Sequence, residues 1–585
     1  MTPHSTGTAK GETSVPALAK SLEESLKHGQ YDHSLLDLAR RLDKMIAALP
    51  GTFRTTENRE YLKIKGMVVE ILDYFGQFDE AQDVLKEIGP QVSERVESRR
   101  KAAVQITDVD TRKLAREQVR LCLEYAQTSY RRHHYRPAEV IIRNCQDMVD
   151  KCVVDEIKFP CYGTRARISY YLGRTLRQTN QYDEAESCFV DSIRYHHERA
   201  KRKLQEHAND ANAEPVREEL DYARHKSAIC LSLGLGWLSY TKGALARAKS
   251  YLMPARVLLL SLNDSINGTY VQLILGAIER SLAGRDEVKL GDAMELLKKP
   301  WKTFEELGHL PYRARAILEL SLAHLYAGDL VKAEWGQKEV QKYAGEKQDV
   351  RWRCNGLILE SRINLEKARR ISDRKRSECL LKTAEGKALE ALTAAEKEGN
   401  TQLLCKIDAL IARGEARIEL GDFEHARKDL RKAIEINRKE DSRGTLSRLA
   451  ENTNPKIEVV CNLHLARLYI KEKNARDAAV CLERWKELRE QVEHASVREL
   501  GASIEGEFLK LRTPFVREPG SGDLNLKNNR LELYAWLRRE AAFRKSKKKE
   551  QNELMGISGQ TRSNYERELN KKNPPPRKTG RRHKR

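Results

Sequence analysis

Apolar side chains recur along this chain as pairs of helical stripes joined by a short turn. In the clearest pair, Leu172 and Gly173 precede a turn at Asn180, and Ala185 and Phe189 follow on the second stripe. Leu172 and Gly173 would let a neighbouring helix approach closely, while Ala185 would lie where the two helices cross. One such pair cannot bury its own apolar face, so the pattern predicts a stack of several helix pairs.

The combination of a turn, a small residue and, in most copies, a larger apolar residue four positions on recurs along most of the chain. The alanines expected at the helix crossings are Ala81, Ala138, Ala185, Ala248, Ala333, Ala426 and Ala478. Successive members are 57, 47, 63, 85, 93 and 52 residues apart. Seven recognisable copies predict an all-helical array.

Over about residues 30–510 the chain resembles the tetratricopeptide (TPR) repeat family. That family's pattern runs Leu-Gly, then Gly-x-Tyr-x-x-Ala, then an aromatic residue or leucine four positions on, and it is clearest here at Leu172–Phe189 and Gly421–Leu430. The standard unit of about 34 residues is shorter than every spacing above, which indicates longer helices or degenerate pairs hidden in the wide gaps. The resemblance implies an all-α, TPR-like solenoid over residues 16–513.

Length and charge favour an extended array over a compact enzyme. The chain has 585 residues, whereas single cores stop growing at roughly 250–300 residues. Charged residues make up 33% of the chain and aromatic residues 6%, as expected for many surface helices with polar outer faces. No proline lies between Pro311 and Pro455, so this stretch is expected to be almost wholly helical.

No catalytic motif is recognisable, and the chain is predicted not to be an enzyme. It has no phosphate-binding loop ending in Gly-Lys-Ser/Thr, no His-Glu-x-x-His helix and no Gly-x-Ser-x-Gly elbow. The adjacent pairs His133-His134 and His196-His197 would point in different directions on a helix. Cys145, Cys152 and Cys161 lack the paired spacing of zinc ligands, which favours buried free thiols. Neither a cofactor nor a metal is expected.

The termini and the apolar runs bear on the compartment. Residues 1–15 are polar, without the apolar core of a secretory signal, and are expected to be disordered. The longest apolar run, Ala255–Leu262, is far short of the roughly 20 residues that span a membrane. Scattered cysteines indicate a reducing compartment. We expect a cytoplasmic protein, associated with the nucleoid in a bacterium or able to enter the nucleus in a eukaryote.

One helix offers a candidate surface for a partner. In TPR proteins the first helix of each pair lines the concave surface, which commonly receives peptide segments or partner helices. Aligned on Leu172-Gly173, that surface would include Arg167, Tyr170, Arg174 and Arg177. Three guanidinium groups near a tyrosine could receive an acidic peptide or a carboxylate. Alternatively, these arginines pair with acidic residues of adjacent helices.

The positive charge is concentrated at the C-terminal end. Of the formal net charge of +21, residues 538–585 supply +12 through 17 Lys or Arg and 5 Glu, so the other 537 residues carry +9. Two prolines and two glycines within residues 514–529 interrupt the helical pattern and predict a linker there. A small helical module is expected at 530–572, followed by a disordered basic tail at 573–585.

Residues 553–561, Glu-Leu-Met-Gly-Ile-Ser-Gly-Gln-Thr, have the form of a helix-turn-helix, with Gly556 ending one helix and Ser558 capping the next. They resemble bacterial helix-turn-helix domains of the Fis type, with Leu-Leu-Gly-Ile-Ser-x-x-Thr. They also resemble the mercury-resistance regulator (MerR) type, in which Gly-Val-Ser-x-x-Thr precedes Tyr-Glu-Arg, here residues 565–567. The resemblance implies a recognition helix that contacts DNA. The DNA-binding residues would be Ser558, Gln560, Thr561, Arg562, Asn564, Arg567, Lys571 and Lys572.

These features predict a non-enzymatic regulator that holds a protein or peptide partner in its solenoid and DNA at its C-terminal module. The alternative is a TPR scaffold whose basic tail binds RNA or DNA without sequence preference, or directs the protein to the nucleus. Eight positive charges follow Asn570 with no acidic residue, so such binding would depend steeply on salt. The sequence leaves the oligomeric state open.

Overall fold

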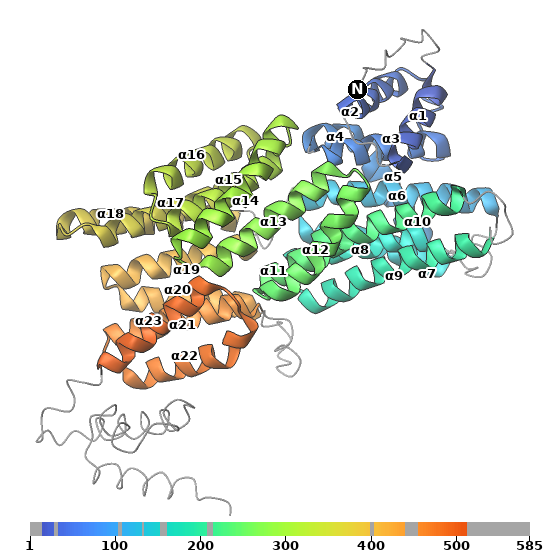
Figure 1. The fold of residues 1–585 in the computed structure, drawn as a ribbon. Helices are drawn as coiled ribbons and strands as arrows, with labels where there is room; N and C mark the ends of the chain where they lie inside the picture. The colour runs from blue at the N-terminus through green and yellow to red at the C-terminus, as the bar shows by residue number, and fades with distance from the viewer. Residues whose placement is uncertain are drawn as a thin grey trace, which may run out of the picture.

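The computed structural model describes residues 14–28, 33–75, 77–102, 108–131, 134–152, 161–206, 214–397, 403–438 and 454–511, and every regular element in these ranges is a helix (Figure 1). The predicted all-α class is confirmed for this part of the chain. Within it, no helix combines the length and the apolar character needed to cross a bilayer. The linker, the helix-turn-helix module and the basic tail predicted beyond residue 513 lie outside the described residues.

The helices follow one another in short hairpins, and each packs against its neighbours in sequence (Figure 1). The first twelve are α1 (Val15–His28), α2 (His33–Ala47), α3 (Arg59–Tyr74), α4 (Phe78–Leu85), α5 (Ile88–Ala102), α6 (Val109–Arg131), α7 (Tyr135–Cys152), α8 (Tyr162–Gln178), α9 (Tyr182–Glu206), α10 (Glu214–Ile229), α11 (Trp237–Lys242) and α12 (Leu245–Ser261). The others are α13 (Ser265–Ala283), α14 (Glu287–Glu306), α15 (Leu310–Tyr326), α16 (Leu330–Lys347), α17 (Val350–Arg370), α18 (Arg374–Lys397), α19 (Leu403–Leu420), α20 (Phe423–Arg438), α21 (Pro455–Lys471), α22 (Ala475–Leu488) and α23 (Ala495–Leu511).

The pair α8–α9 shows why the repeat needs its small residues. A Cβ on Gly173 would lie 2.9 Å from the ring of Phe189 and 3.1 Å from the carbonyl oxygen of Ala185. Between the helices, Asn180 adopts a left-handed conformation with φ of 59°, as the predicted turn requires. Phe189 also reaches Gly234 in the next layer. The roles predicted for these positions are confirmed.

The predicted crossing points hold throughout the array. All seven alanines of the repeat pattern are at most 1% exposed. Because these residues come from seven different helices, their common burial shows that one packing rule organises the solenoid from α4 to α22. The repeated small residue is what lets successive helices approach.

The wide spacings between the alanines have two causes, helix pairs hidden in the gaps and longer helices, which apply in different parts of the chain. The two widest gaps contain the pairs α13–α14 and α17–α18, whose crossing residues Ala293 and Ala388 are fully buried. The gap before Ala248 instead reflects longer helices. There α9 is 25 residues long, and α10 continues into α11 through a π-helical segment at Cys230–Gly236.

The C-terminal helices return to the middle of the chain, where α21 packs against α11 and α23 against α13. The backbone N–H of Glu493 donates to the carbonyl of Gly243 at 3.0 Å. The carboxylate of Glu493 accepts from the backbone N–H of Ala246 at 2.6 Å, and the Asn454 amide donates to the carbonyl of Thr241 at 3.1 Å. These contacts, which we call the seam, join residues that are 213 and 247 positions apart in the sequence.

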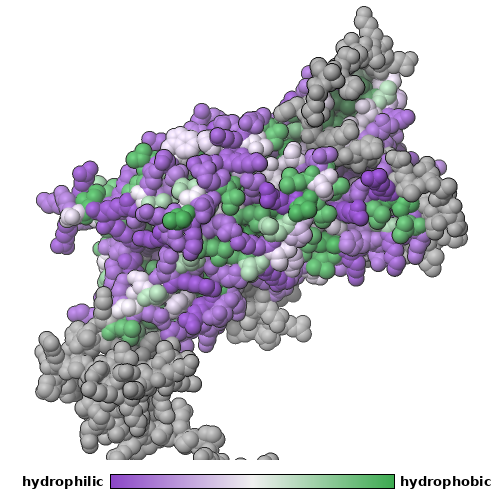
Figure 2. Space-filling model, viewed as in Figure 1, coloured by the Kyte–Doolittle hydropathy of each residue, from purple (hydrophilic) through white to green (hydrophobic). Residues whose placement is uncertain are grey.

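The outer surface is mainly polar. Figure 2 shows a face that is largely hydrophilic, with apolar residues in small separate patches. On α12, for example, Met253 and Val257 are 52% and 67% exposed. Charged outer faces on many helices account for the high content of charged residues.

Candidate partner-binding surface

The four residues predicted to face a partner lie along α8 but enter different environments. Arg167, nearest the start of the helix, is 3.0 Å from Glu70 on α3 and 3.5 Å from Glu124 on α6. Arg120 and Lys226 also pair with Glu70, at 3.0 and 3.6 Å. Burial raises the pKa of Glu70, but these three cations hold it well below its usual range. Arg167 therefore makes the ion pairs with adjacent helices that the sequence left open as an alternative.

Arg174 is in a different setting, because it lies among aromatic rings. Its guanidinium is 4.8 Å from the ring centre of Tyr130 on α6 and 5.6 Å from that of Tyr170. The side chain is partly exposed, and among the described residues it has neither an ion-pair nor a hydrogen-bond partner. Burial raises the pKa of Tyr130, yet Arg174, Arg177 and Arg351 together lower it. The local potential is therefore positive.

Arg177 is held by the protein itself. It is buried and donates to the backbone carbonyl of Leu233 at 2.6 Å. Its guanidinium also lies 5.9 Å from the ring centre of Trp237, and Arg315 of α15 lies 4.8 Å from the same ring. Trp237 thus sits between two arginines from different helix pairs.

Tyrosines of the next two pairs extend this arrangement. The rings of Trp237 and Tyr270 have centroids 6.2 Å apart, and those of Tyr270 and Tyr312 are 4.3 Å apart. All contributing helices are the first members of their pairs. We call the whole set the inner cluster: Tyr130, Tyr170, Arg174, Arg177, Trp237, Tyr270, Tyr312 and Arg315.

Further charges lie on the corresponding helices of later pairs. Arg351 of α17 is partly exposed and, within the described part of the chain, has no ion-pair partner. Asp408 of α19 is exposed, and Lys456 of α21 is partly exposed. Burial lowers the pKa of Lys456 to about 8, helped by the nearby arginines and opposed by Asp408. The charges are thus mixed, with cations in excess.

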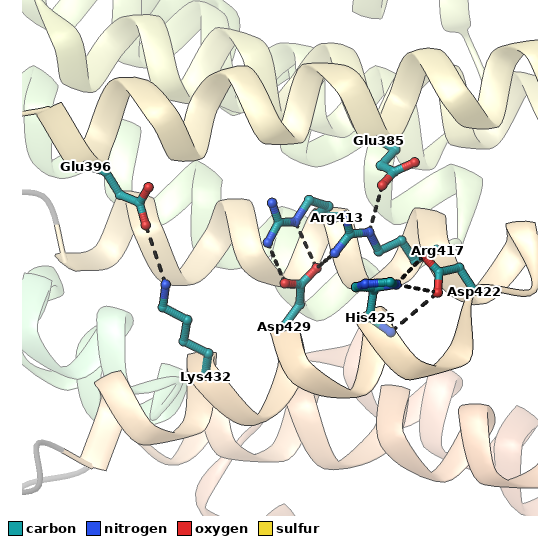
Figure 3. A network of polar contacts seen from close by, with 8 residues as sticks. All are labelled: Glu385, Glu396, Arg413, Arg417, Asp422, His425, Asp429 and Lys432. Atoms are coloured by element: carbon teal, nitrogen blue, oxygen red, sulfur yellow. Dashed lines mark hydrogen bonds and ion pairs between the residues drawn. The ribbon is translucent and has the colours of Figure 1, made fainter.

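The pair α19–α20 is held together by ion pairs. Arg413 donates two hydrogen bonds to Asp429, at 2.8 and 2.5 Å, and Arg417 donates a third at 2.8 Å (Figure 3). Arg417 also donates to Glu385 of α18 at 2.7 Å, which links this pair to the preceding one. In the same pair, a Cβ on Gly414 would lie 3.1 Å from Leu430, four residues after the crossing alanine.

Residues 407–440 match the tetratricopeptide repeat family. The match spans most of α19 and α20, where the sequence pattern is among the clearest. It supports the TPR resemblance drawn from the sequence, whereas a helix-turn-helix of the Fis or MerR type is not shown. TPR repeats indicate a protein-interaction scaffold.

Two solved structures illustrate what the chain is similar to. The crystal structure of Rap protein complexed with competence and sporulation factor shares 13% identity, covers 72% of this chain and 97% of that chain, and gives a TM-score of 0.43. The crystal structure of the APC/C hetero-tetramer Cut9–Hcn1 shares 12% identity, covers 88% of this chain and 96% of that chain, and gives a TM-score of 0.26. No curated protein matches the sequence.

The TPR register explains one residue of the inner cluster that sequence reasoning missed. Trp237 directly follows Gly236, as Arg174 follows Gly173, and Gly236 packs against Leu252 as Gly173 packs against Phe189. The TPR alignment could therefore have identified Trp237. Tyr270 and Tyr312 do not follow such a dipeptide, because Tyr270 lies before Leu275-Gly276 of α13 and α15 has no Leu-Gly dipeptide.

The remaining predicted residues divide into two groups. The eight DNA-binding residues lie outside the described part of the chain: Ser558, Gln560, Thr561, Arg562, Asn564, Arg567, Lys571 and Lys572. Cys145 and Cys161 are buried free thiols, as expected. Among the described residues, no group of three or more His, Cys, Asp or Glu side chains could hold a metal ion.

Proposed function

We propose that this chain is a non-enzymatic interaction protein whose inner cluster binds an acidic segment of a protein partner. The observation that carries the proposal concerns Arg174 and Arg351. Both are partly exposed and act on the same tyrosine, and within the described residues neither has a carboxylate partner. Guanidinium groups in a partly desolvated setting attract carboxylates strongly, and the tyrosine rings offer apolar contact to neighbouring side chains.

A protein segment suits this surface better than a nucleic acid. Arginines beside aromatic rings can also receive bases and phosphates. However, Asp408 is exposed near the cations, and Glu319, buried on α15, pairs with Arg315 at 2.5 Å. Asp408 would repel a continuous phosphate backbone, and Glu319 neutralises part of the charge of Arg315, whereas a peptide can alternate acidic and neutral side chains along its length.

The proposal is tested by fluorescence anisotropy on the full-length chain with a labelled peptide of alternating Glu and Leu. The double variant Arg174→Gln/Arg351→Gln is expected to weaken binding at least about tenfold, since two charge-assisted contacts of about 1 kcal/mol each are lost. The matched control is Arg194→Gln/Arg224→Gln, which removes two arginines that are each 60% exposed on α9 and α10. Equal weakening by both variants would mean non-specific attraction and would overturn the proposal.

The same peptide is expected to bind about fivefold more weakly at pH 9 than at pH 7. Lys456, with its pKa lowered to about 8 chiefly by burial, is charged below that pH and neutral above it. One partly exposed ion pair of up to about 1 kcal/mol is therefore lost as the pH rises. Lys456→Arg keeps its charge at both pH values and should reduce the pH dependence. An unchanged dependence in that variant would show that Lys456 does not take part.

The C-terminal end carries a second, separate proposal, that it attaches the protein to nucleic acid. Its support is the charge of +12 over residues 538–585. The full-length chain and a version ending at Lys572 would be compared by selection on randomised DNA duplexes at two salt concentrations. An enriched motif that survives truncation supports the helix-turn-helix proposal, whereas salt-sensitive binding that is lost with the tail supports a non-specific basic anchor.

The chemistry of the cysteines supports a reducing compartment for this function. Thiols such as Cys145, Cys230 and Cys461 are free and buried. Disulfides are rare in reducing compartments, so an interaction protein of the cytoplasm is the proposal that fits these residues. The proposal would fail if fractionation of the native cells recovered the chain in an oxidising compartment.

A further inference from the structure

A cavity of about 580 Å³ opens at the N-terminal end of the helix stack. Residues of α1, α3, α6, α8, α9 and α10 line it. Its volume falls in the range of roughly 300–1,000 Å³ that small-molecule sites occupy. Arg167 reaches it from the same stripe of α8 that carries Arg174, seven residues further on. No residue of the inner cluster lines the cavity, so the two sites are distinct.

The lining carries more positive than negative charge. It contains eight Lys or Arg side chains and six Glu side chains, an excess of two positive charges. The carboxylates are shared, because Glu70 alone pairs with Arg120, Arg167 and Lys226. Arg120 and Arg167 have further carboxylates in Glu117 at 3.8 Å and Glu124 at 3.5 Å, so the excess of positive charge is a property of the lining as a whole.

Two side chains show the sign of the potential inside the cavity. Burial raises the pKa of Tyr222, but Lys226, Arg167 and Arg199 lower it overall. Behind it, burial and the same three cations lower the pKa of His196 to about 3. Both shifts mean that negative or neutral forms are favoured over positive ones, as expected beside three nearby cations.

The cations converge on one ring. The guanidinium of Arg199 lies 4.7 Å and the ammonium of Lys226 5.5 Å from the ring centre of Tyr222. Gly163 makes room for Arg199, since a Cβ there would come within 2.9 Å of its Nη1. Arg199 is also fixed by Glu219 at 2.8 Å. The two cations are thus held in place before any ligand arrives.

We propose that this cavity binds a phosphate monoester through Arg199, Lys226 and the cations now gathered on Glu70. A dianion matches the excess of two positive charges, and the guanidinium groups can each offer two N–H donors to phosphate oxygens. The ligand would share the three cations of Glu70 rather than require new ones. The phosphate could belong to a small molecule or to a phosphorylated side chain, since the chemistry recognised is the same.

The test is isothermal titration of the full-length chain with three probes: inorganic phosphate, adenosine monophosphate and a phosphoserine peptide. At least one is expected to bind saturably, and Arg199→Gln and Lys226→Gln should each weaken it about tenfold or more. Lys249→Gln is the matched control, because Lys249 is ion-paired with Glu279 on α12–α13, away from the cavity. Its affinity should equal that of the wild type. The probe that binds best identifies the source of the phosphate.

A gain of affinity provides a second readout that misfolding cannot mimic. Glu218 lines the cavity and is exposed, and within the described residues it has no ion-pair partner. Glu218→Gln removes a repelling charge and is expected to tighten binding about threefold. Failure of all three probes to bind at millimolar concentration would overturn the proposal, as would variants that bind like the wild type. The variant Arg174→Gln/Arg351→Gln changes no residue that lines this cavity, so the two proposals fail independently.

Discussion

Replacing Asp429 with alanine is expected to destabilise the α19–α20 repeat by about 3–5 kcal/mol, because breaking a buried ion pair leaves an uncompensated charge. The Asp429 side chain is 6% exposed and accepts hydrogen bonds from both Arg413 and Arg417. Those guanidinium groups are themselves only 14% and 15% exposed, so water replaces little of what is lost. Few single changes in the described part of the chain remove three charge-assisted bonds at once.

The effect is best measured as faster hydrogen exchange of the α19 and α20 amides, because solenoids can open locally. Glu424→Ala in the same repeat is the control, since Glu424 is 71% exposed and, among the described residues, forms its ion pair with Lys428 alone. An exposed pair is worth at most about 1 kcal/mol. Comparable exchange in the two variants would show that the Asp429 network contributes little to the repeat.

Replacing Phe189 with alanine is expected to lower the free energy of unfolding by a similar amount, about 3–5 kcal/mol. Phe189 is fully buried. Its ring fills the space left by Gly173 in its own pair and by Gly234 in the next layer. Neither glycine has a side chain that could move into the cavity, so the space would remain empty.

Urea denaturation followed by circular dichroism would measure the loss. Val190→Ala, one position further along the same helix, is the matched control, because Val190 is 51% exposed and deletion of its methyl groups opens no cavity. The control should change stability by less than about 0.5 kcal/mol. If Phe189→Ala were equally mild, the layers would not depend on this contact.

The sequence predicted the repeating part of the fold because the residues that pack at each helix crossing lie close together in the sequence. Ala185, for example, lies 5 residues after Asn180 of the turn and 12 residues after Gly173 of the first helix. Ala293 was missed although Leu275-Gly276 precedes it in the same pair, whereas the pair of Ala388 keeps the buried alanine without a Leu-Gly dipeptide. The seam could not be predicted, since a contact between Thr241 and Asn454 has no local signal.

In the candidate site too, contacts within one helix pair could be predicted from the sequence, whereas contacts between distant pairs could not. Arg174 was predicted from its place beside Leu172-Gly173, but its neighbours come from other helix pairs, and their meeting depends on how the pairs stack. Arg167 shares the stripe with Arg174, yet the structure places it against Glu70, which is 97 residues away in the sequence. Which arginine keeps a carboxylate partner is decided by the superhelix, not by the helix that carries it.

The seam changes the mechanics of the molecule. A solenoid with two free ends behaves as a spring, and its repeats can be stretched, bent or lost from an end with nearest-neighbour costs. Here Glu493 and Asn454 form hydrogen bonds with residues of α11, of α12 and of the turn between them. The helices from α11 to α23 therefore form a closed loop. The loop cannot widen to admit a bulky folded domain unless the hydrogen bonds of the seam first break. If the inner cluster binds a partner as proposed, its residues on α11, α13 and α15 would therefore be open only to thin, extended segments. Removal of the last helices would loosen a region more than 200 residues upstream.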